Sequence, residues 1–124
     1  MPPQVMIVKD TNTIPWDELI SDQTGQKMIE KKLLRDPDTG MMINFVHFPA
    51  GYLTPWHRHD CAHGIYVLEG TLYTHEGSYG PGTFVWFPEG CVAEHGAKTE
   101  TGVTVLFITN KEFNISFVDK PIET

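Results

Sequence analysis

Short apolar runs separated by glycine and proline turns constrain the fold of this chain most strongly. Runs of strand length are expected at residues 27–35, 41–48, 64–68, 71–74, 83–87, 103–109 and 113–118. Turn signals separate them, as in Asp36-Pro37-Asp38-Thr39-Gly40. No segment shows a sustained helical period, although one short turn of helix is expected at residues 16–20. Short strands at this spacing favour an all-β sandwich or barrel.

The length and hydrophobicity of the chain fit one globular domain. With 124 residues it can bury one core and is too short for a second. We expect a single domain over residues 1–124, with an amino-terminal arm at 1–26 and a β-barrel core at 27–118. The composition is 40% hydrophobic and 20% charged, and no apolar run approaches the ~20 residues that span a bilayer. A membrane protein is not expected.

The charge balance argues against nucleic acid as a partner. Nine basic residues stand against sixteen acidic ones, giving a net charge of −7, and no stripe of lysine or arginine stands out. The first residues, MPPQVMIVKD, have no long apolar stretch behind a basic start. We therefore expect a cytoplasmic protein.

Three of the six histidines fall within seven residues, at His57, His59 and His63. Successive side chains of a strand point to opposite faces, so His57 and His59 must point the same way. His63 keeps this parity if the chain stays extended. Neutral imidazole binds borderline transition metals well. This cluster therefore predicts a metal site.

The histidine cluster resembles the first motif of the cupin superfamily. That motif, G-x5-H-x-H-x3-E-x6-G, matches at Gly51, His57, His59 and Gly70. His63 stands where the family usually has glutamate. As a metal-binding histidine it would complete a four-histidine site; as a histidine at the rim it would only border the ion.

A second cupin motif follows and then departs from the family pattern. The motif G-x5-P-x-G-x2-H matches at Gly82, Pro88 and Gly90, but Ala93 occupies the histidine position. A shift of two residues along a strand keeps the direction of a side chain, whereas a shift of one reverses it. We therefore assign His95 as the fourth ligand, beside His57, His59 and His63.

The stretch at residues 32–40, with Gly51 and the histidines after it, looks more narrowly like cupins related to the anti-sigma factor ChrR and to diketone- or ring-cleaving dioxygenases. The resemblance covers about residues 15 to 110. It implies a double-stranded β-helix, the jelly roll of cupins, and a homodimer, because edge strands need cover.

A four-histidine site would keep a charge near +2 and attract a chelating anion. It implies one divalent ion, with Fe(II) or Mn(II) favoured for oxygen chemistry and Zn(II) or Ni(II) as alternatives. Aromatic side chains are expected to wall the pocket. The candidates are Trp56, Tyr66, Trp86 and Phe107.

The leading functional interpretation is a dioxygenase that cleaves a small chelating molecule, a diketone, hydroxyketone or phenolic compound, with dioxygen as co-substrate. A sensor cupin of the anti-sigma type and a metal-dependent isomerase or lyase are the alternatives, because the fold does not fix the chemistry. No catalytic residue is assigned. The polar groups considered for proton transfer are Glu94, Tyr66 and His75.

Overall fold

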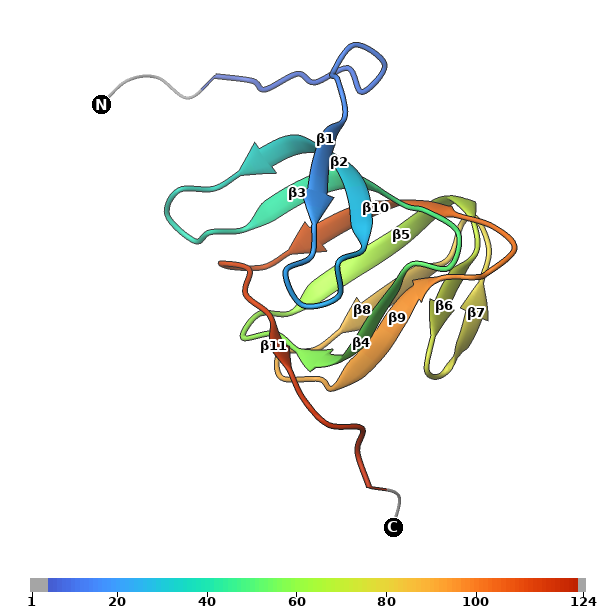
Figure 1. Cartoon of the computed structure of the whole chain (residues 1–124). Coiled ribbons are helices and arrows are strands. Elements are labelled where there is room, and N and C mark those ends of the chain that lie inside the picture. The colour runs from blue at the N-terminus through green and yellow to red at the C-terminus, as the bar shows by residue number, and fades with distance from the viewer. Residues whose placement is uncertain (1–4, 123–124) are drawn as a thin grey trace.

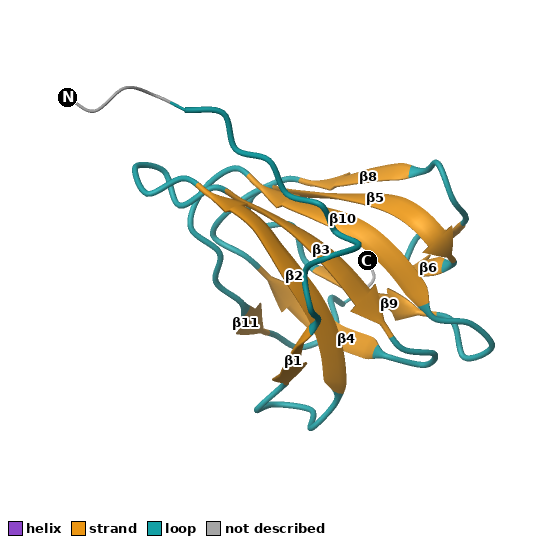
Figure 2. Ribbon diagram, turned by 90° about the horizontal axis from the view of Figure 1, so that it is seen from above, coloured by secondary structure: helices purple, strands orange, loops and turns teal. Residues whose placement is uncertain are grey.

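Two antiparallel sheets pack face to face in the computed structural model, which describes residues 5–122 (Figure 1 and Figure 2). Within these residues there are strands and turns but no helix, and the expected all-β jelly roll is confirmed. The strands are β1 (Asp17–Ile20), β2 (Lys27–Arg35), β3 (Met42–Phe48), β4 (Leu53–Arg58), β5 (His63–Gly70), β6 (Leu72–Thr74), β7 (Gly77–Tyr79), β8 (Phe84–Phe87), β9 (Ala93–Ala97), β10 (Val103–Thr109) and β11 (Ser116–Phe117).

The central strands of each sheet pair with strands from distant parts of the chain. One sheet has the order β1-β2-β3-β10-β5-β8 and the other the order β11-β4-β9-β6-β7. Strand β10 lies between β3 and β5, and β9 lies between β4 and β6. The interior is therefore built from long-range pairs, which place the two histidine-bearing strands β4 and β9 side by side.

The strands alternate between core and surface with a period of two. In β5, His63, Ile65 and Val67 are buried, whereas Tyr66 and Leu68 are exposed. Strand β10 alternates in the same way, and the buried members of both strands meet residues of the opposite sheet in one core. This alternation puts the side chain of His63 on the inner face of its sheet.

Several expected elements differ from those observed. The expected turn of helix at 16–20 is strand β1, because Asp17–Ile20 pair with β2 and this tertiary pairing overrides a weak local preference. Gly77–Tyr79, which was not among the expected strands, forms β7 and returns along β6. The expected last strand at 113–118 is reduced to Ser116–Phe117, which pair with the end of β4. The runs at 27–35 and 103–109 are strands with the expected bounds.

The outer face of the six-stranded sheet carries large exposed apolar side chains. They gather on β5 and β8 and are Tyr66, Leu68, Phe84 and Trp86. The expected homodimer stays a prediction, as do the boundaries of the arm and barrel core. Among the residues that the structure describes, no helix is both long and apolar enough to span a bilayer.

We predict that Gly96→Ala destabilises the fold, because an added Cβ would lie 1.9 Å from the carbonyl oxygen of Tyr52. Gly96 pairs with Leu53 of β4 and Tyr73 of β6, so neither neighbour can move away without breaking a ladder. Thermal or urea unfolding should show a loss of about 3 kcal/mol or more.

The matched control for this change is Gly80→Ala. No atom lies within 4 Å of the position of its added Cβ. Its free energy of unfolding should stay within about 0.5 kcal/mol of the wild type. Equal stability of the two variants would contradict the close approach of β9 to β4.

Candidate metal centre

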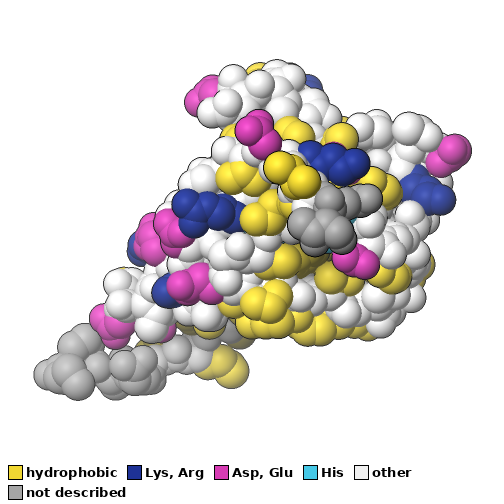
Figure 3. Space-filling view, turned by 90° about the horizontal axis from the view of Figure 1, so that it is seen from below, with side chains coloured by type: hydrophobic (Ala, Val, Ile, Leu, Met, Phe, Trp, Pro, Cys, Tyr) yellow, Lys and Arg dark blue, Asp and Glu magenta, His cyan; other side chains and the backbone are white. Residues whose placement is uncertain are grey.

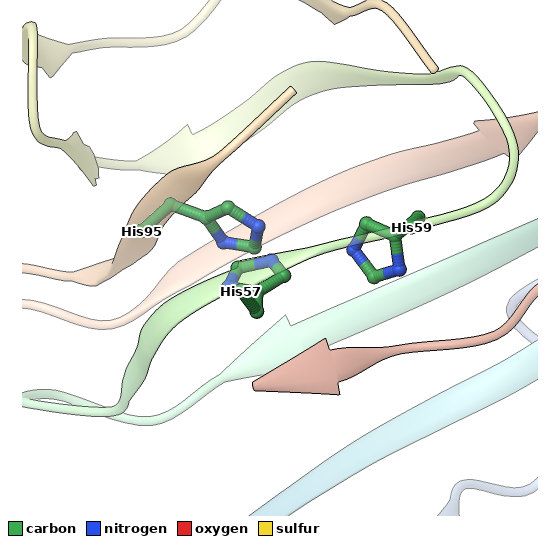
Figure 4. Close-up of side chains that lie close together, drawn as sticks. All are labelled: His57, His59 and His95. Atoms are coloured by element: carbon green, nitrogen blue, oxygen red, sulfur yellow. The ribbon is translucent and has the colours of Figure 1, made fainter. Parts of the chain in front are cut away.

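Three of the predicted ligands converge inside the barrel (Figure 4). His57 lies in β4, His59 follows the end of that strand, and His95 lies in β9. All three are buried, and one potential ligand atom from each lies within 4.8 Å of the others. The ring of His57 is in the middle, 4.8 Å from the ring of His59 and 4.7 Å from that of His95, measured between centroids.

The pairing of β4 with β9 produces this convergence. Thr54 pairs with His95 and His57 pairs with Ala93, with an irregular register between the two pairs. Ala93, His95 and Ala97 are buried, whereas Glu94 is only half-buried. The side chain of His95 therefore faces the interior, as the two-residue shift predicted, and its role as a ligand stays a prediction.

Backbone carbonyls fix the orientation of two of the rings. Nδ1 of His57 donates to the carbonyl oxygen of Pro55 at 2.7 Å, and Nδ1 of His59 donates to that of Asn114. Because a carbonyl can only accept, the proton of each ring lies on Nδ1. The Nε2 atoms are then unprotonated and free to bind an ion, the arrangement typical of histidine ligands.

His95 gives the clearest indication that the site binds an ion. Both of its ring nitrogens are buried and have no hydrogen-bond partner among the described residues. An unsatisfied buried polar group costs about 1–3 kcal/mol. A bound transition metal ion would satisfy one of these nitrogens, so the donor set fits such an ion.

His63 lies beside the three-histidine group. Its ring is 4.6 Å from that of His59 and is stacked between Phe87 at 4.6 Å and Phe107 at 5.1 Å, measured between centroids. Both of its nitrogens are buried without a partner in the described part of the chain. The structure brings His63 close to the group but not into it, so its role as a fourth ligand stays a prediction.

Burial keeps these imidazoles neutral. It lowers the pKa of His57 to about 4 and that of His63 to about 3. The pKa values of His59 and His95 are also lowered, again mainly by burial. At neutral pH the rings are therefore neutral, and an ion does not have to compete with a second ring proton.

A cavity of about 900 Å³ lies next to the three histidines and extends between the sheets. The hairpin joining β1 to β2 lines one side and the segment from Phe113 to Phe117 lines another. Hydrophobic side chains gather on the face of the molecule shown in Figure 3. Exposed apolar residues that line the cavity include Leu19, Ile20 and Ile115. The cavity thus joins a polar histidine cluster to apolar walls.

The expected aromatic wall is only partly correct. Phe107 lines the cavity, but Tyr66 and Trp86 are 40% and 48% exposed on the outer face of their sheet. Trp56 does not line the cavity, and its ring packs against His75 instead. Tyr66 points outward because it alternates with the buried Ile65 and Val67. The aromatic residues that do line the cavity are Phe48, Tyr52, Phe107, Phe113 and Phe117.

The polar groups considered for proton transfer lie outside the cavity. Glu94 accepts a hydrogen bond from the hydroxyl of Tyr73, and its backbone N–H donates to Nδ1 of His75. The polar residues that do line the cavity include Glu30 and Lys32 on β2 and Asn44 on β3, which sequence reasoning missed. The alternation of side chains along a strand could have identified Glu30. The strand at 27–35 was predicted with the correct bounds, and Glu30 lies on the same face of it as Met28.

We predict that His57→Ala, His59→Ala and His95→Ala each reduce metal retention at least about tenfold, since losing a ligand should cost more than losing a group that only orients one. The measurement is metal content per chain after dialysis. The control is His75→Ala, which removes a histidine outside the cavity. If one of these three variants keeps its full metal content, the histidine that it lacks is not a metal ligand.

His63 needs a separate test because its ring also fills space. His63→Phe keeps an aromatic ring between Phe87 and Phe107 but removes both nitrogens, so it should weaken metal retention if His63 is a ligand. His63→Glu should keep the ion while lowering the charge of the site by one, which weakens the binding of anionic ligands. Unchanged metal content and anion affinity in His63→Phe would make His63 a rim residue.

Comparison with known proteins supports the same family at the level of sequence and of fold. The family model of the ChrR cupin-like domain matches residues 4–113. No curated protein is significantly similar to the chain in sequence. A candidate acetylacetone dioxygenase from Methylibium petroleiphilum has a similar fold, with a TM-score of 0.76 and 13% identity over 99% of this chain and 90% of that chain.

Two further solved structures share the fold. The polyketide cyclase RemF from Streptomyces resistomycificus is 19% identical over 94% of this chain and 88% of that chain, with a TM-score of 0.74. A cupin-like protein from Thermotoga maritima is 20% identical over 75% of this chain and 77% of that chain, with a TM-score of 0.67. Since the family model matches most of the chain, including the residues of both histidine motifs, the chain belongs to the ChrR cupin-like domain family.

Proposed function

We propose that this protein is a metal-dependent oxidoreductase, a dioxygenase that cleaves a small chelating substrate: a diketone, a hydroxyketone or a phenolic compound. The observation that carries the proposal is the convergence of three buried imidazoles on a cavity of about 900 Å³ with largely apolar walls. A cavity of this size suits a small organic molecule. The fold shared with a candidate acetylacetone dioxygenase adds support at the level of the scaffold.

The proposed ion is Fe(II) or Mn(II), because these ions support oxygen chemistry; the imidazole donors would also suit Zn(II) or Ni(II). When bound, it would supply Lewis-acid stabilisation of an enolate or phenolate and electron transfer with dioxygen. The histidines are neutral, so they leave the positive charge of the ion uncompensated. This favours an anionic, chelating substrate.

The remaining residues of the site position the substrate and exclude water. Backbone carbonyls hold the rings of His57 and His59 in fixed orientations. Phe113 packs against the ring of His59 at 4.7 Å and Phe117 lies 6.3 Å from that of His57, both measured between centroids. Water is thereby displaced from the histidines, which strengthens electrostatic interactions at the site.

We predict that protein loaded with Fe(II) or Mn(II) consumes dioxygen in a one-to-one ratio with a diketone or catechol, whereas protein loaded with Zn(II) binds these compounds without consuming dioxygen. An oxygen electrode and mass spectrometry of the products would measure this. The controls are His57→Ala and His59→Ala, which should be inactive.

The same experiment separates the alternative functions. Product formation without dioxygen would indicate an isomerase or lyase. Binding without turnover for Fe(II), Mn(II) and Ni(II) alike would indicate a sensor. Either result would contradict the proposed dioxygenase.

A further inference from the structure

Glu30 and Asn44 form a buried polar pair in the cavity wall, beside the exposed Lys32, which also lines the cavity. They lie on the neighbouring strands β2 and β3, and each side chain is only 6% exposed. The same wall contains Met28, Met42 and Val46. Burying a carboxyl and an amide among such residues costs free energy unless their hydrogen bonds are met. A ligand that forms hydrogen bonds with this pair would therefore lower the cost of burying it.

The two side chains satisfy each other only in part. Nδ2 of Asn44 donates to Oε2 of Glu30 at 3.3 Å, and its second contact is with Sδ of Met42 at 3.6 Å. Among the described residues no other hydrogen bond reaches either side chain. A carboxylate can only accept, and the amide nitrogen of Asn44 is already engaged. The unused capacity of the pair is therefore that of an acceptor.

The free oxygens of the pair can be reached from the cavity. The fully buried side-chain atoms without a partner all belong to His63 and His95 in the described part of the chain. The remaining oxygens of Glu30 and Asn44 thus keep accessible surface, and both residues line the cavity that His57 also lines. The histidines and the pair thus line one cavity, which a single ligand can occupy.

The charge of the pair selects the kind of group that it binds. Burial raises the pKa of Glu30, and the positive charge of Lys32 partly offsets this effect. A partly desolvated carboxylate binds a hydroxyl donor more strongly than a solvated one does, because hydrogen bonds to charged acceptors are the stronger class. A second anion would be repelled. The anionic end of the substrate therefore belongs at the metal centre and not at Glu30.

We infer that the substrate carries a hydroxyl group at the end away from its chelating oxygens, and that this hydroxyl donates to Glu30 and Asn44. The inference rests on the proposed function, because it takes the chelating end to be held at the three histidines. It narrows the substrate class from simple diketones and phenols to chelating molecules with a second, neutral hydroxyl.

The test uses protein loaded with Zn(II), so that binding is measured without turnover. The probes are benzoylacetone and its analogues with a phenolic hydroxyl in the meta or the para position, and isothermal calorimetry gives their affinities. The wild type should bind one of the hydroxylated analogues about tenfold more tightly than benzoylacetone, as expected for one hydrogen bond to a charged group.

Glu30→Leu should abolish this preference, measured within the variant as the ratio of its affinities for the hydroxylated analogue and for benzoylacetone. Glu30→Gln, which keeps the shape and one acceptor, should keep part of the preference and guards against a folding defect in the leucine variant. The matched control is Glu69→Leu, an exposed position of β5 that does not line the cavity and should keep the full preference.

The outcomes separate the inference from the proposed function. Equal affinity of the wild type for all three probes, or a preference that survives in Glu30→Leu, would overturn the inference while chelation at the metal stands. Failure of every probe to bind the loaded wild type, or equal binding with and without the metal, would overturn the proposed function and the inference with it.

Discussion

The pairing of β4 with β9 is the interaction on which the rest of this structure depends. It joins segments that are far apart in the sequence and sets His95 across from the strand that carries His57. The close approach at Gly96, where a Cβ would meet the carbonyl of Tyr52, leaves little freedom in this ladder. A rigid ladder can hold imidazoles at the separations that a single ion requires.

The interior contains several buried polar side chains. Four histidines, a glutamate and an asparagine are buried on the inner faces of the two sheets. Only some of these groups have hydrogen-bond partners. His57 and His59 donate hydrogen bonds to backbone carbonyls, whereas the ring nitrogens of His63 and His95 have no partner among the described residues. Natural proteins tolerate such costs mainly where a ligand or an ion offsets them. The buried polar groups without a hydrogen-bond partner thus indicate where the functional site of the barrel lies.

Much of the fold was predictable from local patterns. Alternating residues gave the bounds of the strands at 27–35 and 103–109, and glycine and proline marked the turns between strands. The shared facing of His57 and His59, and the inward facing of His95, follow from the period of two along a strand. Strands β1 and β7 were missed, because their stability comes from pairing with a neighbouring strand and not from their own residues.

The lining of the cavity was the weakest part of the prediction. Tyr66 and Trp86 looked suitable because they are aromatic and close to the motifs, yet parity sends them to the outer face. Phe113 and Phe117 come from a segment near the end of the described chain, and their approach to His59 and His57 depends on the short pairing of β11 with β4. Closeness to the histidine motifs in the sequence was therefore a poor guide to the residues that line the cavity.

By itself, the sequence determined the strand periodicity, the turns and the histidine motifs, because these depend on backbone geometry within a few residues. Only the tertiary structure decided which side chains share the cavity. It brought His95 to His57, placed His63 between two phenylalanine rings beside the cluster, and turned Glu30 and Asn44 toward the same space. These relations depend on which strands become neighbours and in what register, and long-range pairing sets both.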